Sequence, residues 1–455
     1  MSENNGNQSV TALSENPHYF YQYSSIRDAI HNLSSNLLEE KALEQDLLGL
    51  ISARVVPNIE SFVLLNSDIT SVFREHSPTL EEREVVYRPN VSIKGNKPVG
   101  IGHHVSCIGY NVSLENNSIT DTSSSWNVPL SLRRVGLSEN KNAFTAIQVK
   151  EVLEAIGTQD LVVNCLDSNY HSPEYIAGTA DVSNLVNIIR ISSSQNVWES
   201  VPSDNVKISK ETRGAKAVYG AKYKLSEVEN WDCELSEEVF IPFTQKNGKE
   251  VIVRIQSWDK RKVRTKRSLS MKGHSARLIR IEMFDKDKKP LHHRSLWLTV
   301  WGKRKGELSL KNIFLAYRKR FDIEHFFRFA KQRLLLNSFQ TPSLQHSENC
   351  LKIVQLSYWV LWIAESELRA EKLKLPKWQR YLPTEQQRVK KGGILSPTQV
   401  QKNIGIIFLT FEKKPFLPKV SKNKTGRKPN EKQLKRTRYP INFKTKRKKV
   451  KENPP

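Results

Sequence analysis

The sequence predicts an α/β fold, with a mixed sheet flanked by helices and a mostly β section inserted into it. Two apolar, strand-like runs at 62–73 and 160–170 each lead into an aspartate, and a helix-like segment at 141–156 lies between them. Residues 193–290 differ in style, because they are polar, rich in lysine and contain short alternating runs. A strand, helix, strand succession is typical of α/β sheets, and strict alternation is typical of half-buried strands.

The N-terminal segment, residues 1–60, reads as a polar leader followed by one or two helices, since leucine and isoleucine recur at helical spacing over 24–52. The polar start lacks the charged-then-apolar layout of a signal peptide. No apolar run approaches the roughly 20 residues of a membrane span. The four cysteines show no CxxC spacing, so neither a zinc site nor a disulfide framework is predicted. We therefore expect a cytoplasmic protein without a membrane partner.

Further apolar runs extend the predicted sheet, and the apolar style returns after the β section. Strands are expected at 99–114, 126–135, 184–192 and 295–303, and a buried helix at 348–370. The resulting domain boundaries are 1–60 for the leader and helices, 61–192 for the first part of the core, 193–290 for the insertion, 291–385 for the second part of the core, and 386–455 for a C-terminal extension.

The charge balance points to a polyanionic partner. Lys and Arg number 72 against 47 Asp and Glu, which gives a formal charge of +25 and a pI of about 9.7. Residues 421–450 alone hold thirteen Lys and Arg and one acid, Glu431. Such a tail is expected to be disordered until it meets an anion. Arg427 and Lys428, within a GRKP stretch, are candidate DNA contacts, and a generic solvated tail is the alternative.

Residues 317–334, YRKRFDIEHFFRFAKQRL, combine basic, acidic and aromatic groups at regular offsets. As one helix, the segment places Arg320, Glu324, Arg328 and Lys331 within roughly 80° of one another. The opposite side is a broad apolar stripe made by Ile323, Phe326, Phe327, Phe329, Ala330 and Leu334. The polar row is either an exposed stripe with an Arg320–Glu324 pair worth a few tenths of a kcal/mol, or the wall of an active site.

Three carboxylates are candidate catalytic and metal-binding groups. Asp68 and Asp167 follow apolar strands, and Glu324 lies on the half-buried helix, so the three can converge. Hard oxygen ligands of this kind suit Mg²⁺ or Mn²⁺. Two such ions about 3.5–4 Å apart would support an in-line displacement at phosphorus. The alternative for a strand-end aspartate is a turn former or a helix cap.

The spacing of Tyr317, Arg320, Glu324 and Lys331, Tyr-x2-Arg-x3-Glu-x6-Lys, resembles the signature of DDE transposases encoded by a large group of bacterial insertion sequences. The neighbouring stretches resemble one branch of that group, and the likeness spans roughly residues 17–400. The stretches that carry it are 67–90 and 93–104 around the first aspartate, 161–170 around the second, 322–336, FQTPS at 339–343 and the glutamine-containing helix at 354–365.

The resemblance implies an RNase H-like catalytic core, interrupted by a β-rich insertion between its fifth strand and the glutamate-bearing helix. It implies that Asp68, Asp167 and Glu324 hold two Mg²⁺ or Mn²⁺ ions. Tyr317, Arg320 and Lys331 would contact the DNA backbone, and Arg328 in the same row is a further candidate DNA contact. The implied reaction is cleavage at the terminal inverted repeats of the element and strand transfer into target DNA. A homo-oligomeric synaptic complex, associated with the bacterial nucleoid, would carry it out.

Some features depart from the pattern of the family or leave its use open. Asn66-Ser67 precedes the first aspartate where apolar or small residues are usual, and Ser-Asn-Tyr follows the second. These leave open an inactive, DNA-binding remnant, while an RNase H-like endonuclease without strand transfer is a further alternative. The resemblance also suggests that an aromatic side chain of the insertion stacks on a displaced base. Core packing is the alternative for the candidates Trp198, Trp231 and Trp258.

Overall fold

A computed structural model describes most of the 455-residue chain. The described residues are 1–2, 9–10, 12–15, 23–57, 62–88, 98–112, 126–200, 219–245, 248–264, 271, 273–370, 394–410 and 435–442. Within them, no helix combines the length and the apolar character that a membrane crossing requires.

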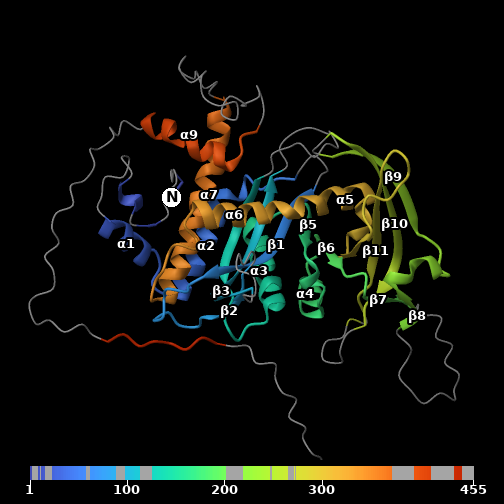
Figure 1. The fold of residues 1–455 in the computed structure, drawn as a ribbon, viewed down its shortest axis with the longest axis horizontal. Helices are drawn as coiled ribbons and strands as arrows, with labels where there is room; N and C mark the ends of the chain where they lie inside the picture. The colour runs from blue at the N-terminus through green and yellow to red at the C-terminus, as the bar shows by residue number, and fades with distance from the viewer. Residues whose placement is uncertain are drawn as a thin grey trace, which may run out of the picture.

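The molecule is built on a mixed sheet of twelve strands with helices packed against it (Figure 1). Ten strands run in the order β2-β3-β1-β5-β6-β12-β11-β10-β7-β8, while β4 pairs with β3 and β9 with β10. The strands of the first half are β1 (Phe62–Phe73), β2 (Glu84–Tyr87), β3 (Val99–Val112), β4 (Trp126–Arg134), β5 (Leu161–Leu166) and β6 (Leu185–Ile191). Five of them, in the order β4-β3-β1-β5-β6, are antiparallel as far as β1 and parallel beyond it. The predicted α/β class with a mixed sheet is confirmed.

The β-rich section continues the same sheet. Its strands are β7 (Asn196–Ser200), β8 (Tyr219–Lys224), β9 (Glu237–Thr244), β10 (Glu250–Lys262) and β11 (Ala276–Phe284), followed by β12 (Leu296–Trp301). β12 pairs with β6 on one side and with β11 on the other, both antiparallel. The sequence change at 193 is therefore not a break in hydrogen bonding, because β12 joins the two halves into one sheet.

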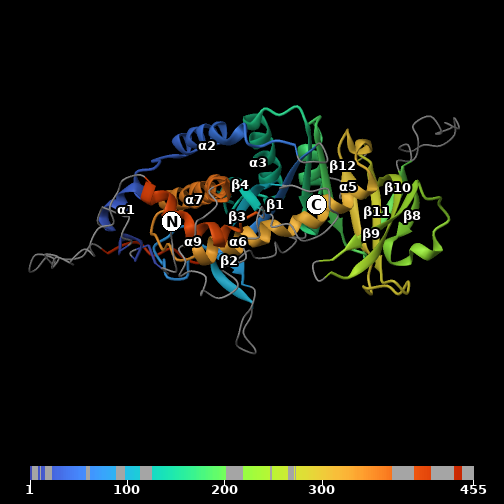
Figure 2. The same cartoon turned by 90° about the horizontal axis from the view of Figure 1, so that it is seen from above.

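Helices cover both faces of the first half of the sheet. They are α1 (Tyr23–His31), α2 (Leu37–Ser52), α3 (Lys141–Ile156), α4 (Pro173–Thr179), α5 (Leu310–Arg318), α6 (Asp322–Arg333), α7 (Leu344–Ala370) and α9 (Pro397–Thr410). Figure 2 shows α2 and α3 on one side of β1, with α5 and α6 on the other. Part of the polar leader also packs, since Val10 and Leu13 lie in the main core. α9 and the short β2 are elements that sequence patterns did not predict.

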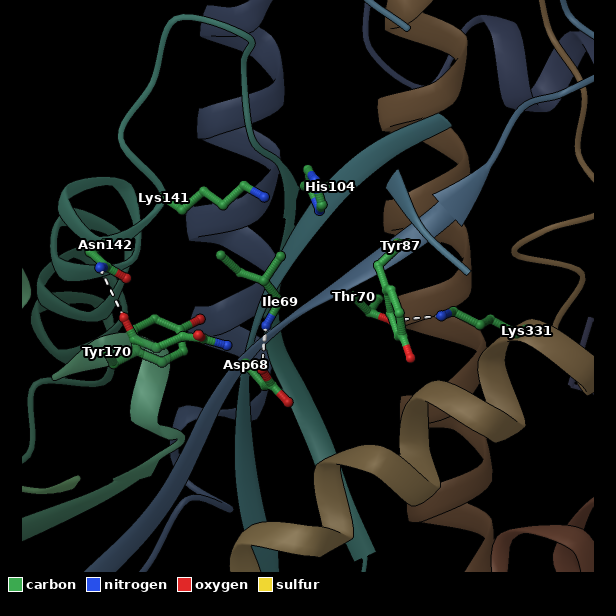
Figure 3. Close-up of a pocket in the computed structure, with 11 residues that line it drawn as sticks. Asp68, Ile69, Thr70, Tyr87, His104, Lys141, Asn142, Tyr170 and Lys331 are labelled. Carbon is green, nitrogen blue, oxygen red and sulfur yellow. Dashed lines mark hydrogen bonds between the residues drawn. The ribbon is translucent and has the colours of Figure 1, made fainter. Parts of the chain in front are cut away.

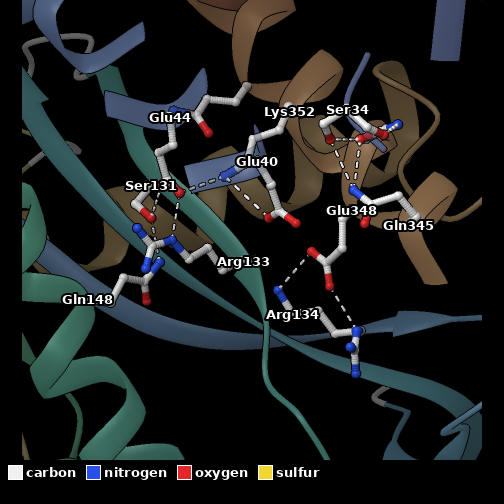
Figure 4. Close-up of polar contacts among 12 residues, drawn as sticks. Ser34, Glu40, Glu44, Ser131, Arg133, Arg134, Gln148, Gln345, Glu348 and Lys352 are labelled. Carbon is white, nitrogen blue, oxygen red and sulfur yellow. Dashed lines mark hydrogen bonds and ion pairs between the residues drawn. The ribbon is translucent and has the colours of Figure 1, made fainter. Parts of the chain in front are cut away.

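A buried ionic network ties α2 and α7 to the sheet (Figure 4). The Lys352 ammonium is fully buried and lies 2.8 Å from a carboxylate oxygen of Glu44, which also receives a 2.6 Å bond from Arg133. Burial raises the pKa of Glu40 to about 7, and the nearby Glu348 carboxylate adds to the rise. Removing one partner of a buried ion pair leaves an uncompensated charge, which is costly. The network therefore favours the observed position of α2 against β4 and α7.

The segment predicted as one helix over 317–334 is two helices joined by a 3-10 turn, Lys319–Phe321. The break has a clear cause: Asn66 on β1 donates to the Lys319 carbonyl at 3.0 Å, and Asn111 on β3 donates to it at 3.5 Å. These side chains pin the carbonyl to the sheet at the turn. The predicted apolar stripe on α6 is confirmed, because every one of its members is buried.

The prediction that the whole basic tail is disordered is wrong for residues 435–442, which lie against the outer edge of β2. Asn442 donates its backbone N–H to the Arg83 carbonyl at 2.8 Å and accepts from Val85 at 3.3 Å. The Tyr439 N–H donates to the Pro78 carbonyl at 3.1 Å. An open strand edge offers unpaired backbone groups, and the tail satisfies them despite its charge.

Removing the tail is expected to weaken non-specific DNA binding and to flatten its salt dependence. In a chain that ends before Ser421, the slope of log K against log salt should be smaller than in the full chain by about 0.9 for each phosphate that the tail neutralises. A chain ending at Asn442 is the matched control, since it keeps the segment on β2 and lacks only the last six Lys and Arg. Filter-binding titrations over salt measure the slopes. Equal slopes for all three chains would show that the tail does not touch DNA.

Candidate active site

The two predicted aspartates lie at neighbouring positions where parallel strands β1 and β5 part. Ser67 pairs with Leu166, the last residue of β5, so Asp68 and Asp167 occupy the next position on each chain. Neighbouring strands lie about 5 Å apart, which brings the two residues side by side. After this point β5 turns into the short 3-10 segment Ser168–Tyr170, whereas β1 continues to Phe73.

Alternate residues of β1 hold the α5–α6 segment. Asn66 binds the Lys319 carbonyl, Asp68 lies 3.9 Å from the Arg320 guanidinium, and Thr70 accepts a 2.6 Å bond from the Lys331 ammonium. Side chains two residues apart on a strand point to the same face, so this face of β1 forms a ladder of polar contacts along α6. The ladder gives the basic residues on either side of Glu324 a partner on β1: Asp68 for Arg320 and Thr70 for Lys331.

Arg320 lies among the three predicted carboxylates. Its guanidinium is 3.1 Å from Glu324 as well as 3.9 Å from Asp68, and only 6% of its side chain is exposed. The guanidinium also stacks over the Phe321 ring at 4.5 Å. Burial lowers the pKa of Arg320, but its neighbours, including Asp68, Glu324 and Asp167, raise it overall. Asp68 and Glu324 therefore flank one buried cation, and Asp167 is near enough for its charge to act on the same group.

The Asp68 carboxyl lies in surroundings that disfavour its charge. Burial raises the pKa of Asp68 to about 6, and the charges of Asp167 and Glu324 add to the rise. The N–H of Ile69, which donates to the carboxylate at 2.8 Å, and the Arg320 charge oppose it. A carboxylate whose charge is disfavoured in this way is stabilised by any further cation that approaches it.

The two remaining cations of the row differ in their surroundings. Lys331 is half-buried against Thr70, and burial lowers the pKa of its ammonium to about 8, with Asp68 opposing the shift. Arg328 is exposed on α6. Both can reach an anion at this face, and Lys331 loses its charge as the pH rises through about 8.

Tyr317 is placed where it cannot contact DNA directly, which corrects the role predicted for it. Its ring is 4% exposed and its hydroxyl is buried without a hydrogen-bond partner among the described residues. Tyr317 lies on α5, just before the turn, and the Arg320 guanidinium lies over its ring, 6.0 Å from the centroid. Tyr317 therefore supports the position of Arg320 from beneath and does not face an incoming strand.

Sequence reasoning missed several residues that shape the site. Asp322, at the start of α6, is buried and accepts a 2.7 Å bond from Asn111, which holds the turn a second time. The Asn66-Ser67 pair, which departs from the family pattern, has structural uses: Asn66 fastens the turn and Ser67 donates to Asn164 on β5 at 3.0 Å. A polar residue within an apolar strand was the only available signal.

A cavity of about 560 Å³ opens beside Asp68 (Figure 3). Tyr87 and Lys331 stand on one side of it in this view, Lys141 and Asn142 on the other, and Asp68 lies between them. The remaining lining residues are Ile69, Thr70, Ser71, His104, Asn169 and Tyr170. The cavity is lined by polar and apolar groups in similar measure and carries two lysines next to the carboxylate site.

The carboxylate donors fit a hard divalent cation in type, but in this structure they do not form a closed cage. Among the described residues no group of three or more His, Cys, Asp or Glu side chains is close enough to hold a metal ion. Glu324 is 48% exposed, and Asp167 makes only long contacts of 3.4 and 3.5 Å, to Ser168 and Asn169. The Asp167 carboxylate can thus change rotamer at little cost, whereas Glu324 would give up its 3.1 Å contact with Arg320.

Of the three tryptophans considered for stacking on a displaced base, Trp258 is a core residue. It is 3% exposed and packs with Trp231 and Trp297. Trp231 is partly exposed, but its indole N–H donates to the Lys224 carbonyl at 3.0 Å. Trp198 is partly exposed and packs edge-on against Tyr219. Arg427 and Lys428 lie outside the described residues.

No protein-family model and no curated protein matches the sequence. Among solved structures, the cryo-EM structure of a piggyBac transposase synaptic complex with hairpin DNA is similar with a TM-score of 0.33 and 11% sequence identity. The alignment covers 87% of this chain, which spans 62% of that one. A similarity at this TM-score carries no argument about fold family or function.

Proposed function

We propose that this chain is a DDE transposase of an insertion sequence, which cleaves DNA at the ends of the element and joins them to target DNA. The observation that carries the proposal is that Asp68 and Glu324 contact one buried arginine, with Asp167 at the neighbouring position after β5. These are the three carboxylates that the resemblance requires. Their proximity within a chain of net charge +25 favours a phosphodiester substrate over a small neutral one.

The topology supports the same proposal. Of the six strands that precede the β-rich section, five follow the order β4-β3-β1-β5-β6, and the glutamate-bearing α6 follows that section. This is the place that the resemblance gives to an insertion in an RNase H-like core, between the fifth strand and the glutamate helix. Cleavage chemistry would then occur where β1 and β5 part, outside the carboxyl end of β5, a common position for sites in open α/β sheets.

Asp68, Asp167 and Glu324 would hold the divalent ions, for which Mg²⁺ or Mn²⁺ suits their oxygen donors. When bound, such ions activate a nucleophilic water or hydroxyl and stabilise the leaving oxygen. The protein's own groups have separate tasks. Lys331 would neutralise and position the phosphate. Arg320, which is almost as buried as Tyr317, would act through its charge beside the carboxylates, and the Asn66 and Asn111 contacts hold the turn that carries it.

A plasmid carrying the gene with its flanking DNA tests the proposal against its alternatives. With the purified chain and Mg²⁺, we expect nicks at the element ends and joined products with a second plasmid, and no products in excess EDTA. Cleavage without joined products would favour an RNase H-like endonuclease. DNA binding without either reaction would favour an inactive remnant.

A further inference from the structure

We propose that the cavity beside Asp68 is a binding pocket for one unpaired nucleotide, with its base against Tyr87 and its flanking phosphates toward Lys331 and Lys141. The inference deepens the proposed function and rests on it, because it states how the DNA strand lies when its phosphate reaches the carboxylates. It concerns a different surface from the tryptophans of the insertion.

The size and lining of the cavity match this ligand class. A volume of about 560 Å³ falls within the roughly 300–1,000 Å³ of sites that hold small molecules and cofactors. Lys331 and Lys141 contribute positive charge from two sides, while Asn142, Asn169 and Thr70 offer amide and hydroxyl groups for hydrogen bonds. The lysines, amides and hydroxyl suit the phosphates and base edges of a nucleotide, and the apolar part of the lining suits the faces of its base.

Tyr87 provides the aromatic surface. It is the last residue of β2, its side chain is 62% exposed, and it stands on the cavity wall near Lys331. Exposed aromatic rings beside cationic groups are the usual means of holding unpaired bases, since every base has a face that can stack. Paired bases are stacked inside a duplex and cannot reach such a ring, so the pocket selects an unpaired nucleotide.

Contacts with neighbouring segments hold β2, the strand that ends in Tyr87, in place. Arg83, just before the strand, is buried and donates to the carbonyls of Pro78 and Tyr439 at 3.2 and 3.3 Å. The C-terminal segment thus braces the strand that carries Tyr87. On the other side of the cavity Lys141 begins α3, and Asn142 is held by Ser172 at 2.8 Å. Both walls belong to ordered elements.

Photocrosslinking tests the pocket on the full chain. The probe is a short single-stranded oligodeoxynucleotide with one 5-iodouracil, used in salt high enough to weaken backbone-only binding. We expect the crosslinked peptide to contain Tyr87, and Tyr87→Ala to reduce binding of the oligomer about five- to hundredfold, the loss of one stacked base. Tyr87→Phe should bind like the wild type. Phe240→Ala, which removes another exposed ring, is the matched control and should change nothing.

The outcomes separate this inference from the proposed function. Crosslinks confined to Trp198, Tyr219 or other sites, with normal binding by Tyr87→Ala, would overturn the pocket while leaving plasmid cleavage intact. Crosslinking at Tyr87 in a chain that fails to cut DNA would leave the pocket in place and remove the reaction. Equal crosslinking at Tyr87 by a probe with 5-iodouracil paired in a duplex would contradict selection of an unpaired base.

Discussion

Glu324→Gln is expected to reduce Mg²⁺-dependent nicking at the element ends to background. The change is nearly isosteric and removes one ligand charge, so a metal site that needs three carboxylates loses its function. Folding should survive, because α6 is held by its buried aromatic face and by the contacts of Asn66, Asn111 and Lys331 with the sheet. The assay is nicking of plasmid DNA by wild type and variant, with thermal unfolding measured on the same samples.

Lys331→Ala is the matched comparison on the same helix. It should retain part of the activity, because a phosphate contact positions the substrate without activating a nucleophile. If the row were only a solvated face, Glu324→Gln would remove one exposed pair worth about 0–1 kcal/mol and would nick normally. Normal nicking by Glu324→Gln would therefore remove this helix from the active site.

Periodicity predicted the parts of the site that follow from local rules. The apolar face of α6 was visible because phenylalanine and isoleucine recur at helical spacing, and burial of that face forces Glu324 and Arg328 outward. The strands β1 and β5 were visible as apolar runs, and their parallel pairing brings Asp68 and Asp167 together. For these residues, position in the sequence pattern determines position in the fold.

The remaining features depend on contacts between distant segments, which no local pattern contains. The break at Lys319 comes from asparagines on β1 and β3, more than 200 positions earlier. Because of that break, Tyr317 lies on a different helix from Glu324, and its ring packs in the core. Likewise the order of residues 435–442 comes from the open edge of β2, and composition alone predicted disorder.

The pKa of the Asp68 carboxyl group determines whether the protein becomes more or less stable as the pH rises. Its value rises from 3.8 to about 6 on folding, so the native state favours the protonated form. Wild-type stability is therefore greatest below the unfolded value and falls as the pH rises from about 4 to about 6. Asp68→Asn removes this titration. Without metal, the variant should be more stable than wild type by about 1 kcal/mol at pH 4.5 and about 3 kcal/mol at pH 8, while losing cleavage.

Denaturant unfolding in EDTA at several pH values measures this difference, and Asp46→Asn, an exposed change on α2, is the matched control. Adding Mg²⁺ should stabilise the wild type and leave Asp68→Asn unchanged, since a ligand that binds only the native state shifts unfolding by mass action. A gain that is constant over pH would show that Asp68 is not held in a charge-disfavouring site. If Asp68 binds a cation, the extra stability of Asp68→Asn over the wild type should grow as the pH rises toward 6, and Mg²⁺ should reduce it.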